Sequence, residues 1–287
     1  MRYAFIRAHE DEFRVAAQCR VLRVSRSGYY AWSTRPQSER ERQNGLLLER
    51  IRQIHRDSRE AYGTVKTWRF LQAQGVRCGK NRVARLRRCE GLVTRRVRRF
   101  RRIVEHHQLA PAAPNRLQQR FSSTRADAVW VADTTFIHTR AGWLHLAAIL
   151  DLYSRRVVGW SMGAQNNQQL TLAALEMALA HRAPGRGLIH HSDQGSCYVG
   201  ALYQACLARH GIRPSMSAKG NAYDNAVAES FFSTLKNELV HHRDFHTRDE
   251  ARTEIFEFIE LFYNRQRLHQ TLGYVSPAQF ERDAAAA

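Results

Sequence analysis

The chain has 287 residues, 44% of them hydrophobic, which is enough for two core-forming domains and their connectors. This composition excludes a chain that is disordered throughout. The formal net charge of +19 is unusual and predicts a polyanionic partner.

No apolar run reaches the 18 or more residues that indicate a transmembrane helix, and charged residues interrupt the N-terminus where a signal peptide would be apolar. We therefore expect a cytoplasmic, nucleoid-associated protein that does not bind membranes. The five cysteines form no Cys-x-x-Cys pair, so we expect no disulfide framework and no zinc site.

The positive charge is concentrated in the N-terminal part of the chain. Residues 1–128 contain 30 Lys and Arg against 11 Asp and Glu, whereas residues 129–287 contain 15 of each class. Arginine binds phosphate through paired hydrogen bonds, and the release of counterions from several phosphates adds affinity that is independent of sequence. Basic runs are often only solvated surfaces, but an excess of this size favours nucleic acid over an anionic membrane as the partner.

Residues 1–103 are predicted to be a basic, all-α DNA-binding region. Residues 12–32 have a helical pattern with a turn at 25–30. Apolar spacing then predicts helices over 46–56, 64–74 and 81–90. Three short helices joined by Gly-containing turns are typical of a helix-turn-helix-like unit, here about 45–92. The periodicity fits a generic helical bundle equally well, and the charge favours DNA binding. The arginines expected to contact DNA are Arg82, Arg85, Arg88, Arg95, Arg96, Arg98 and Arg99.

Residues 104–126 contain Pro, Ala and Ser without periodicity and are predicted to be a linker. The segment 127–241 then alternates between strand and helix patterns. The predicted strands are 129–138, 143–151, 156–162, 187–191 and 213–217, and the predicted helices are 168–180, 200–210 and 225–241. This order predicts an α/β fold, an RNase H-like mixed five-stranded sheet flanked by helices. A capping box at Thr247 and Glu250 begins a C-terminal helical extension over 242–287.

Three acidic residues stand out in this segment. Asp133 lies in the first predicted strand and Asp193 follows the fourth, while Glu229 lies on the last helix after 35 intervening residues. Cleavage of phosphodiesters by two metal ions needs anionic oxygen ligands that hold Mg²⁺ or Mn²⁺ about 4 Å apart, and carboxylates suit these hard cations. An isolated acid is more often a surface residue or a cap, so the prediction rests on three placements that agree.

The helix with Glu229 has a clear amphipathic pattern. Its buried stripe is predicted to be Val227, Phe231, Leu235 and Leu239. At about 100° per residue, Glu229 and Lys236 lie about 20° apart on the opposite face of the helix. The alternative for Lys236 is an ordinary solvated charge without a binding role.

Four further residues have weaker signals. Asp151 is expected to serve a turn or a salt bridge rather than a metal, and Asp224 with Asn225 is expected to cap the last helix. Asn225 and His191 are also candidates to hold the metal ligands in place, and a purely structural role is equally compatible with His191.

The motifs in order resemble an OrfB-type transposase of bacterial insertion sequences, in the D,D(35)E group whose catalytic core resembles that of retroviral integrases. The similar stretches cover nearly the whole chain: 19–22, 25–30, 62–63, 114–115, 130–135, 191–195, 219–236, 263–264, 272–274 and 276–277. Small departures at His190, Cys197 and Ala222 affect no member of the acidic triad.

This resemblance implies that Asp133, Asp193 and Glu229 are the catalytic, metal-binding triad, with two Mg²⁺ or Mn²⁺ ions, and that Lys236 contacts the DNA of the element end. It implies cleavage that frees a 3′-hydroxyl, which then attacks a second phosphodiester without a covalent protein intermediate. The implied partners are terminal-repeat and target DNA, further copies of the chain on that DNA, and OrfA or an OrfA-OrfB fusion. The alternatives are a non-catalytic DNA-binding regulator and an RNase H-like nuclease.

Overall fold

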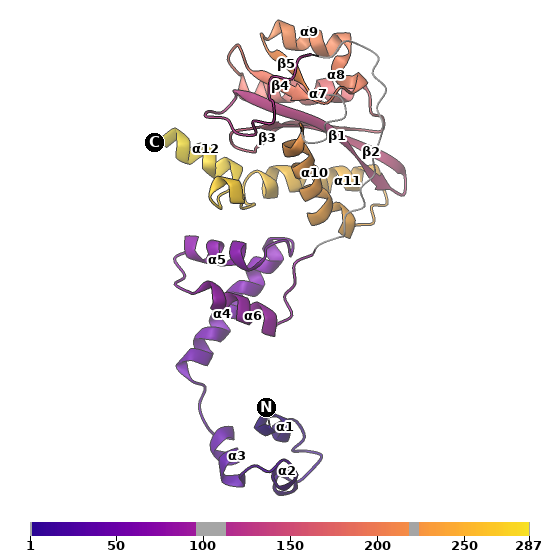
Figure 1. Cartoon of the computed structure of the whole chain (residues 1–287). Helices are drawn as coiled ribbons and strands as arrows, with labels where there is room; N and C mark the ends of the chain where they lie inside the picture. The colour runs from indigo at the N-terminus through magenta and orange to yellow at the C-terminus, as the bar shows by residue number, and fades with distance from the viewer. Residues whose placement is uncertain (1, 96–112, 218–223, 287) are drawn as a thin grey trace. The chain divides into compact units, whose positions relative to one another are not determined.

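The computed structural model describes residues 2–95, 113–217 and 224–286 (Figure 1). No helix within these ranges is both long and apolar enough to span a membrane. The chain divides into two compact units, Met1–Gln53 and Ile54–Ala287.

The first unit is helical. It contains α1 (Arg2–Ala8), α2 (Val15–Val21), α3 (Arg26–Ser33) and the larger part of α4 (Glu39–Asp57). Its core consists of Ile6, Cys19 and Tyr29, which are at most 2% exposed. The turn expected over residues 25–30 was wrong, because the Ser25 side chain accepts a hydrogen bond from the Gly28 amide and so begins α3.

Helix α4 begins seven residues before the expected start at residue 46. The cause is a capping box that sequence reasoning missed. The Glu41 amide donates to Ser38 Oγ at 3.2 Å, and the Ser38 amide donates to Glu41 Oε2 at 2.9 Å.

The second unit begins within α4 and continues with α5 (Thr64–Ala73) and α6 (Lys80–Cys89), which confirms both predicted helices. One arginine of α6 is internal. Arg87 is 4% exposed and donates to Thr67 Oγ1 at 3.2 Å and to the Leu92 carbonyl at 3.2 Å. This side chain therefore joins α5 to α6.

A mixed sheet forms the centre of the second unit. Its elements are β1 (Val129–Thr139), β2 (Gly142–Asp151), β3 (Val157–Gly163), α7 (Gln168–Arg182), β4 (Ile189–Ser192), α8 (Ser196–Val199), α9 (Ala201–Arg209), β5 (Arg213–Met216) and α10 (Ala226–Glu238). The strand order is β3-β2-β1-β4-β5, with β1 antiparallel to β2 and parallel to β4. The predicted five-stranded mixed sheet is confirmed, and the short helix α8 was not predicted.

Helix α7 packs directly on the sheet at Gly159 of β3. A Cβ atom at this position would lie 2.3 Å from the Ala174 carbonyl oxygen and 2.7 Å from Ala178 Cβ, so only glycine permits this approach. The adjoining core contains Trp130, Leu175 and Tyr203, each at most 1% exposed.

The C-terminal extension is helical, as predicted. It contains η1 (Val240–His242), α11 (Arg248–Glu257), the π-helix η2 (Phe258–Tyr263), η3 (Gln270–Leu272) and α12 (Pro277–Ala286). Thr247 caps α11 as expected, because its hydroxyl accepts from the Glu250 amide at 3.1 Å. Asn264 bonds both the amide and the carbonyl of Val157 at 3.0 Å and thereby covers the edge strand β3.

Candidate active site and nucleic-acid interface

Asp133 lies on β1, two residues beyond the point where the pairing of β1 with β4 ends. The pairing of β1 with β4 stops at Val131 opposite His191, so the following residues of β1 lack a strand partner on that side. Asn225, at the start of α10, fills this gap by donating its amide to the Ala132 carbonyl at 3.0 Å. The N-terminal end of α10 is thus attached one residue before Asp133.

Asp193 follows the end of β4 directly, and its loop holds the carboxylate in place. The Gly195 amide donates to Asp193 Oδ1 at 2.9 Å, and a Cβ atom at Gly195 would lie only 2.9 Å from the same oxygen. Gln194 anchors the loop by donating to the Ser217 carbonyl at 2.9 Å. These contacts explain why glycine follows Asp193 at an interval of two residues.

Helix α10 has the two faces that its sequence predicts. Val227, Phe231, Leu235 and Leu239 are buried, whereas Glu229 is exposed. The Lys236 Nζ atom lies 5.1 Å from the centroid of the Phe136 ring of β1. The helix packs on β1 and β2, so its charged residues lie beside the strand that carries Asp133 (Figure 1).

The three acids interact electrostatically. Burial raises the pKa of Asp133 to about 8, with a further increase from the negative charge of Asp193 and a smaller one from Glu229. The hydrogen bond from the Thr134 amide to Asp133 Oδ1, at 2.7 Å, and the charge of Lys236 act in the opposite direction. The structure therefore brings Asp133, Asp193, Glu229 and Lys236 into one electrostatic cluster.

This cluster fits hard cations by its chemistry, since it offers three carboxylates, two of which disfavour the charged form of the third. Across residues 2–95, 113–217 and 224–286, no three His, Cys, Asp or Glu side chains lie close enough together to hold one ion. The three acids therefore do not form a preassembled coordination shell in the described part of the chain. A divalent cation among them would offset the repulsion that raises the pKa of Asp133.

The two histidines before Asp193 are buried in β4. His191 Nδ1 lies 2.9 Å from Ser215 Oγ, and its Nε2 lies 3.3 Å from Ser217 Oγ. His190 Nε2 lies 2.9 Å from the Tyr203 hydroxyl, and burial lowers the pKa of His190 to about 3. These partners favour the structural alternative for His191.

Two acids outside the triad have structural partners. Asp151 is fully buried and accepts from the amides of Asp127 and Ser154, at 2.6 and 2.9 Å, so it stabilises a turn as expected. The expected side-chain cap by Asp224 and Asn225 was wrong, because α10 has no side-chain cap bond. Asp224 instead accepts from the Asn115 amide at 2.9 Å, which attaches the segment before the sheet to the start of α10.

Sequence reasoning missed Tyr198, Phe136 and Trp143. The Tyr198 hydroxyl is buried without a hydrogen-bond partner in the described part of the chain, and Asp133 and Asp193 add to the burial that raises the pKa of Tyr198. Phe136 and Trp143 are about half exposed, and the Phe136 ring lies beside Lys236. Apolar and polar alternation gave no signal for Phe136, because in β1 the polar Thr135 and Thr139 are buried whereas Phe136 is exposed.

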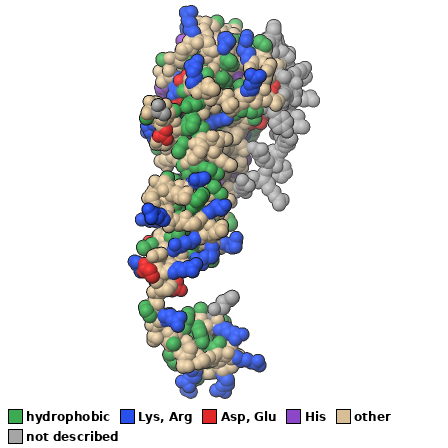
Figure 2. All heavy atoms as spheres, turned by 60° about the vertical axis from the view of Figure 1, so that its left-hand side comes forward, with side chains coloured by type: hydrophobic (Ala, Val, Ile, Leu, Met, Phe, Trp, Pro, Cys, Tyr) green, Lys and Arg blue, Asp and Glu red, His purple; other side chains and the backbone are tan. Residues whose placement is uncertain are grey.

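The predicted DNA-binding arginines have different environments. Arg85 and Arg88 of α6 are exposed, and Arg82 is partly buried. Arg95 forms an ion pair with Glu60 at 2.6 Å. Arg96, Arg98 and Arg99 lie outside the described residues. Figure 2 shows basic side chains on the surface of the N-terminal helical segments.

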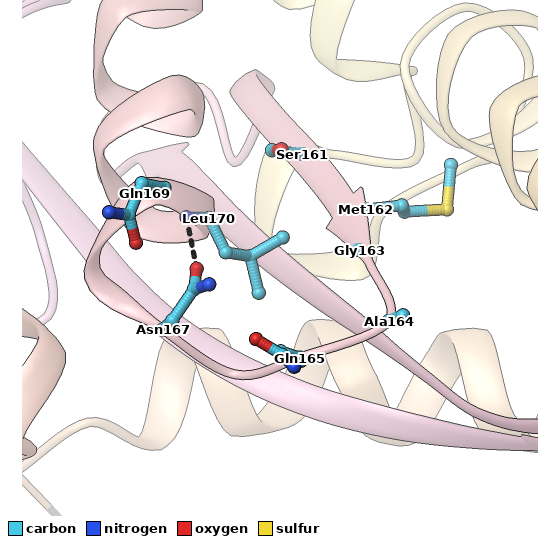
Figure 3. A pocket seen from close by; sticks show the side chains of 8 residues that line it. All are labelled: Ser161, Met162, Gly163, Ala164, Gln165, Asn167, Gln169 and Leu170. Atoms are coloured by element: carbon cyan, nitrogen blue, oxygen red, sulfur yellow. Dashed lines mark hydrogen bonds between the residues drawn. The ribbon is translucent and has the colours of Figure 1, made fainter.

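A shallow pocket of about 370 Å³ lies elsewhere, between the end of β3 and the start of α7 (Figure 3). Its lining includes Met162, Gln165 and Asn167, and Asn167 caps α7 by accepting from the Leu170 amide at 3.0 Å. None of the eight lining residues is ionisable, so the pocket offers no side-chain acid or base.

Family models match three parts of the chain. An integrase core domain matches residues 123–222, a second integrase core domain model matches 229–284, and an HTH-like domain matches 41–100. The first match contains Asp133 and Asp193, and the second begins at Glu229.

Relatives of nearly the same length are known in bacteria. The chain is 45% identical over 262 residues to the insertion element IS600 uncharacterized 31 kDa protein of Shigella sonnei, covering 91% of this chain and 96% of the relative. It is 41% identical over 288 residues to transposase InsF for insertion sequence IS3A of Escherichia coli (strain K12), covering 98% of both.

Solved structures with a similar core are more distant. The HTLV-2 integrase catalytic core domain in complex with magnesium is 15% identical, with a TM-score of 0.43 over 55% of this chain and 98% of that chain. A simian T-cell lymphotropic virus intasome in complex with PP2A regulatory subunit B56 gamma gives 14% identity and a TM-score of 0.46, over 71% of this chain and 67% of that chain.

The fold, the order of the domains and the identity to InsF over the whole chain agree. The chain belongs to the IS3-family insertion-sequence transposases, which combine an HTH-like domain with an integrase core.

Proposed function

We propose that Asp133, Asp193 and Glu229 are the catalytic residues of this transposase and bind two divalent metal ions, Mg²⁺ or Mn²⁺. The observation that carries the proposal is the electrostatic cluster at the end of β4, where two further acids add to the effect of burial in raising the pKa of the partly buried Asp133. Such a group of repelling carboxylates is unfavourable without a cation, and it is typical of sites that bind hard metals.

Each residue has a defined part in this proposal. Asp133 and Asp193 are held by neighbouring parallel strands, with Gly195 and Thr134 amides fixing the two carboxylates. Glu229 approaches from α10. When bound, the metal ions lower the pKa of an attacking water or 3′-hydroxyl and offset charge on the leaving oxygen. Lys236 adds a cation that would bind a phosphate of the DNA end.

The reaction that follows from these roles is cleavage at an element end followed by strand transfer. Water attacks the scissile phosphorus and the strand leaves as a free 3′-hydroxyl. That hydroxyl then attacks a phosphodiester of the target DNA, so one bond is exchanged for another. No protein nucleophile is needed at either step.

We propose that the HTH-like helices bind the terminal repeats, with Arg85 and Arg88 of α6 contacting DNA. Both side chains are exposed on α6, a helix with several basic residues and no acidic one. Arg82, Arg96, Arg98 and Arg99 are proposed as further contacts. Arg95 would contribute less, because Glu60 already offsets its charge.

We also propose that several copies of the chain assemble on DNA, with OrfA or an OrfA-OrfB fusion as a partner. The resemblance to OrfB-type transposases supports this arrangement. Light scattering with and without repeat DNA, and cleavage with and without added OrfA, test the two parts separately.

Asp193→Asn tests the catalytic assignment. The amide keeps the size of the side chain but removes its negative charge, so cleavage of a labelled duplex with the element's terminal repeat is expected to fall at least 1,000-fold. Binding of the same duplex, measured by gel shift, is expected to stay within about twofold.

Asp249→Asn is the matched control, because Asp249 is an acid with a side chain that is 87% exposed, on α11. This variant is expected to cleave like the wild type. If Asp193→Asn still cut terminal-repeat DNA in Mg²⁺, the assignment would be wrong. Cleavage of RNA-DNA hybrids in preference to repeat DNA would instead support an RNase H-like nuclease.

A further inference from the structure

The tip of the β1–β2 hairpin carries a cluster of aromatic rings. Phe136 is 51% exposed and Trp143 is 49% exposed, with ring centroids 5.1 Å apart at an interplanar angle of 86°. The His138 ring lies 5.2 Å from Trp143 at 79°. The register pairs His138 with Trp143, so all three rings lie on one face of the hairpin.

Exposed apolar side chains are ordinary when they are scattered, but here two large ones are in contact and remain half exposed. Each ring would stabilise the fold if it were buried, because an aromatic side chain removes a large apolar area from water. Two rings that stay half exposed are therefore available to contact a ligand. The cluster is named here the hairpin platform and consists of Phe136, His138 and Trp143.

The hairpin platform adjoins the acidic cluster. Lys236 Nζ lies 5.1 Å from the Phe136 ring centroid, and the charge of Lys236 in turn acts on Asp133. Along β1, Phe136 follows Asp133 by three residues, which corresponds to about 10 Å at roughly 3.3 Å per residue, or about three stacked bases at 3.4 Å each. Side chains three residues apart in a strand point to opposite faces, so a DNA strand would reach both around the edge of β1 that β4 leaves open beyond Val131.

The chemistry around the platform fits a nucleic acid strand. Lys236 presents a cation beside an aromatic face, and Arg248 reaches the hairpin by donating to the Trp143 carbonyl at 3.0 Å. In proteins that bind single strands, cations contact the phosphates and exposed rings stack on the bases of the same strand. Such stacking does not depend on the base sequence. A stable protein partner would instead need an interface of about 1,000 Å² or more, which is larger than two half-exposed rings provide.

We propose that Phe136 and Trp143 stack against an unpaired base of the DNA strand whose phosphate lies at Asp133. The inference rests on the proposed function, because it takes the acidic cluster as the place of the scissile phosphate. A paired base is stacked within the duplex, so the strand must separate from its complement within about three nucleotides of the cut.

A double-mutant cycle between protein and DNA tests this inference. Abasic sites are placed singly at the first to fourth nucleotides on either side of the cut, and Kd is measured for each duplex. Full-length Asp193→Asn protein serves as the parent, so that the DNA stays intact. At one position the parent is expected to bind the abasic duplex about tenfold or more weakly. Trp143→Leu is expected to weaken binding of intact DNA similarly and to show no further loss with the abasic duplex.

Two variants serve as matched controls. Trp143→Phe keeps a ring and is expected to retain most of the sensitivity to the abasic site. Phe256→Leu, on α11, removes another ring that is 46% exposed and is expected to bind like the parent. If Trp143→Leu fails to fold, as judged by its circular dichroism, Phe136→Leu carries the same expectation.

Sensitivity to the abasic site that is unchanged in Trp143→Leu, or no sensitivity at any position in the parent, would overturn the inference. If Trp143→Leu lost self-association and its DNA binding did not depend on the abasic site, the platform would instead contact a second copy of the chain. The proposed function has its own test: cleavage of repeat DNA by Asp193→Asn would contradict it. Loss of cleavage in that variant, with Trp143→Leu binding normally, would overturn only the platform.

Discussion

At the level of single residues, the placement of the carboxylates depends on neighbours with no catalytic chemistry of their own. The sequence motifs predicted Asp133, Asp193 and Glu229, and the structure shows the charges of Asp193 and Glu229 raising the pKa of Asp133. It also shows Asn225 donating to the Ala132 carbonyl, where the sequence predicted a helix cap. That contact depends on where β4 stops pairing with β1, a tertiary property that no local pattern contains.

Gly195→Ala is expected to reduce cleavage roughly 100-fold while leaving DNA affinity unchanged, since a misplacement of about 1 Å in a catalytic group has an effect of this size. The added Cβ would lie 2.9 Å from Asp193 Oδ1 and would displace the carboxylate. Cleavage rate at saturating enzyme and gel-shift affinity measure the two quantities.

Gly185→Ala is the control, because a Cβ at Gly185 meets no atom within 4 Å. Wild-type cleavage by Gly195→Ala would show that the close approach to Asp193 has no role in catalysis.

At the level of elements, the strands and helices of the core follow from apolar periodicity, and their order predicted the sheet. The attachments of the C-terminal extension could not be predicted, because they join distant residues. Glu281 of α12 pairs with Arg156 at 2.7 Å and with Arg182 at 3.0 Å, and Arg182 also pairs with Asp127 at 2.9 Å. Sequence spacing gives no signal for partners about 100 residues apart.

Glu281→Gln is expected to lower the free energy of unfolding by about 1–3 kcal/mol at pH 7, the range for charge-assisted hydrogen bonds. Burial alone would raise the pKa of Glu281, but hydrogen bonds from Arg182, Arg156 and Ser154 hold the pKa below its ordinary value of 4.5. The unfolded chain therefore takes up a proton at a higher pH than the folded chain. The stabilisation is fully present above pH 4.5 and is lost as the pH falls below it.

Thermal unfolding of wild type and Glu281→Gln between pH 7 and pH 3.5 measures this difference, which is expected to shrink in the acid range. Asp249→Asn is the control, because its ion pair with Arg252 is exposed and contributes little. A difference between wild type and Glu281→Gln that stays constant with pH would contradict the assigned role of the ion pairs.

At the level of the whole molecule, the positive charge is concentrated in one region of the chain, with 30 basic against 11 acidic residues in 1–128 and 15 of each in 129–287. The sequence did not predict how the HTH-like helices join the C-terminal extension. The Tyr62 hydroxyl, just before α5, accepts from the Leu268 amide at 2.7 Å across 206 positions of sequence. Such a contact depends on the complete fold.

Arg85→Ala and Arg88→Ala are each expected to weaken DNA binding and to reduce the slope of log Kd against log salt by about 1, because each removes one phosphate contact. Cleavage at saturating protein is expected to stay close to that of the wild type. Titrations of repeat DNA between 50 and 300 mM salt, roughly the range over which such slopes are resolved, measure the effect.

Arg87→Ala is an instructive comparison, since Arg87 is buried against Thr67 and Leu92. It is expected to lower thermal stability rather than change only the salt slope. Unchanged slopes in both Arg85→Ala and Arg88→Ala would place the DNA on a surface other than α6.

The proposal that the acidic cluster binds metal is tested most directly by changing the metal preference of one ligand. Asp193→Cys replaces a hard carboxylate with a soft thiolate, which binds Mg²⁺ poorly and Mn²⁺ better. Cleavage of terminal-repeat DNA by this variant is expected to be lost in Mg²⁺ and partly restored in Mn²⁺, whereas the wild type is active in both. Full activity of Asp193→Cys in Mg²⁺, or an equal loss in the two metals, would contradict a role for Asp193 as a metal ligand.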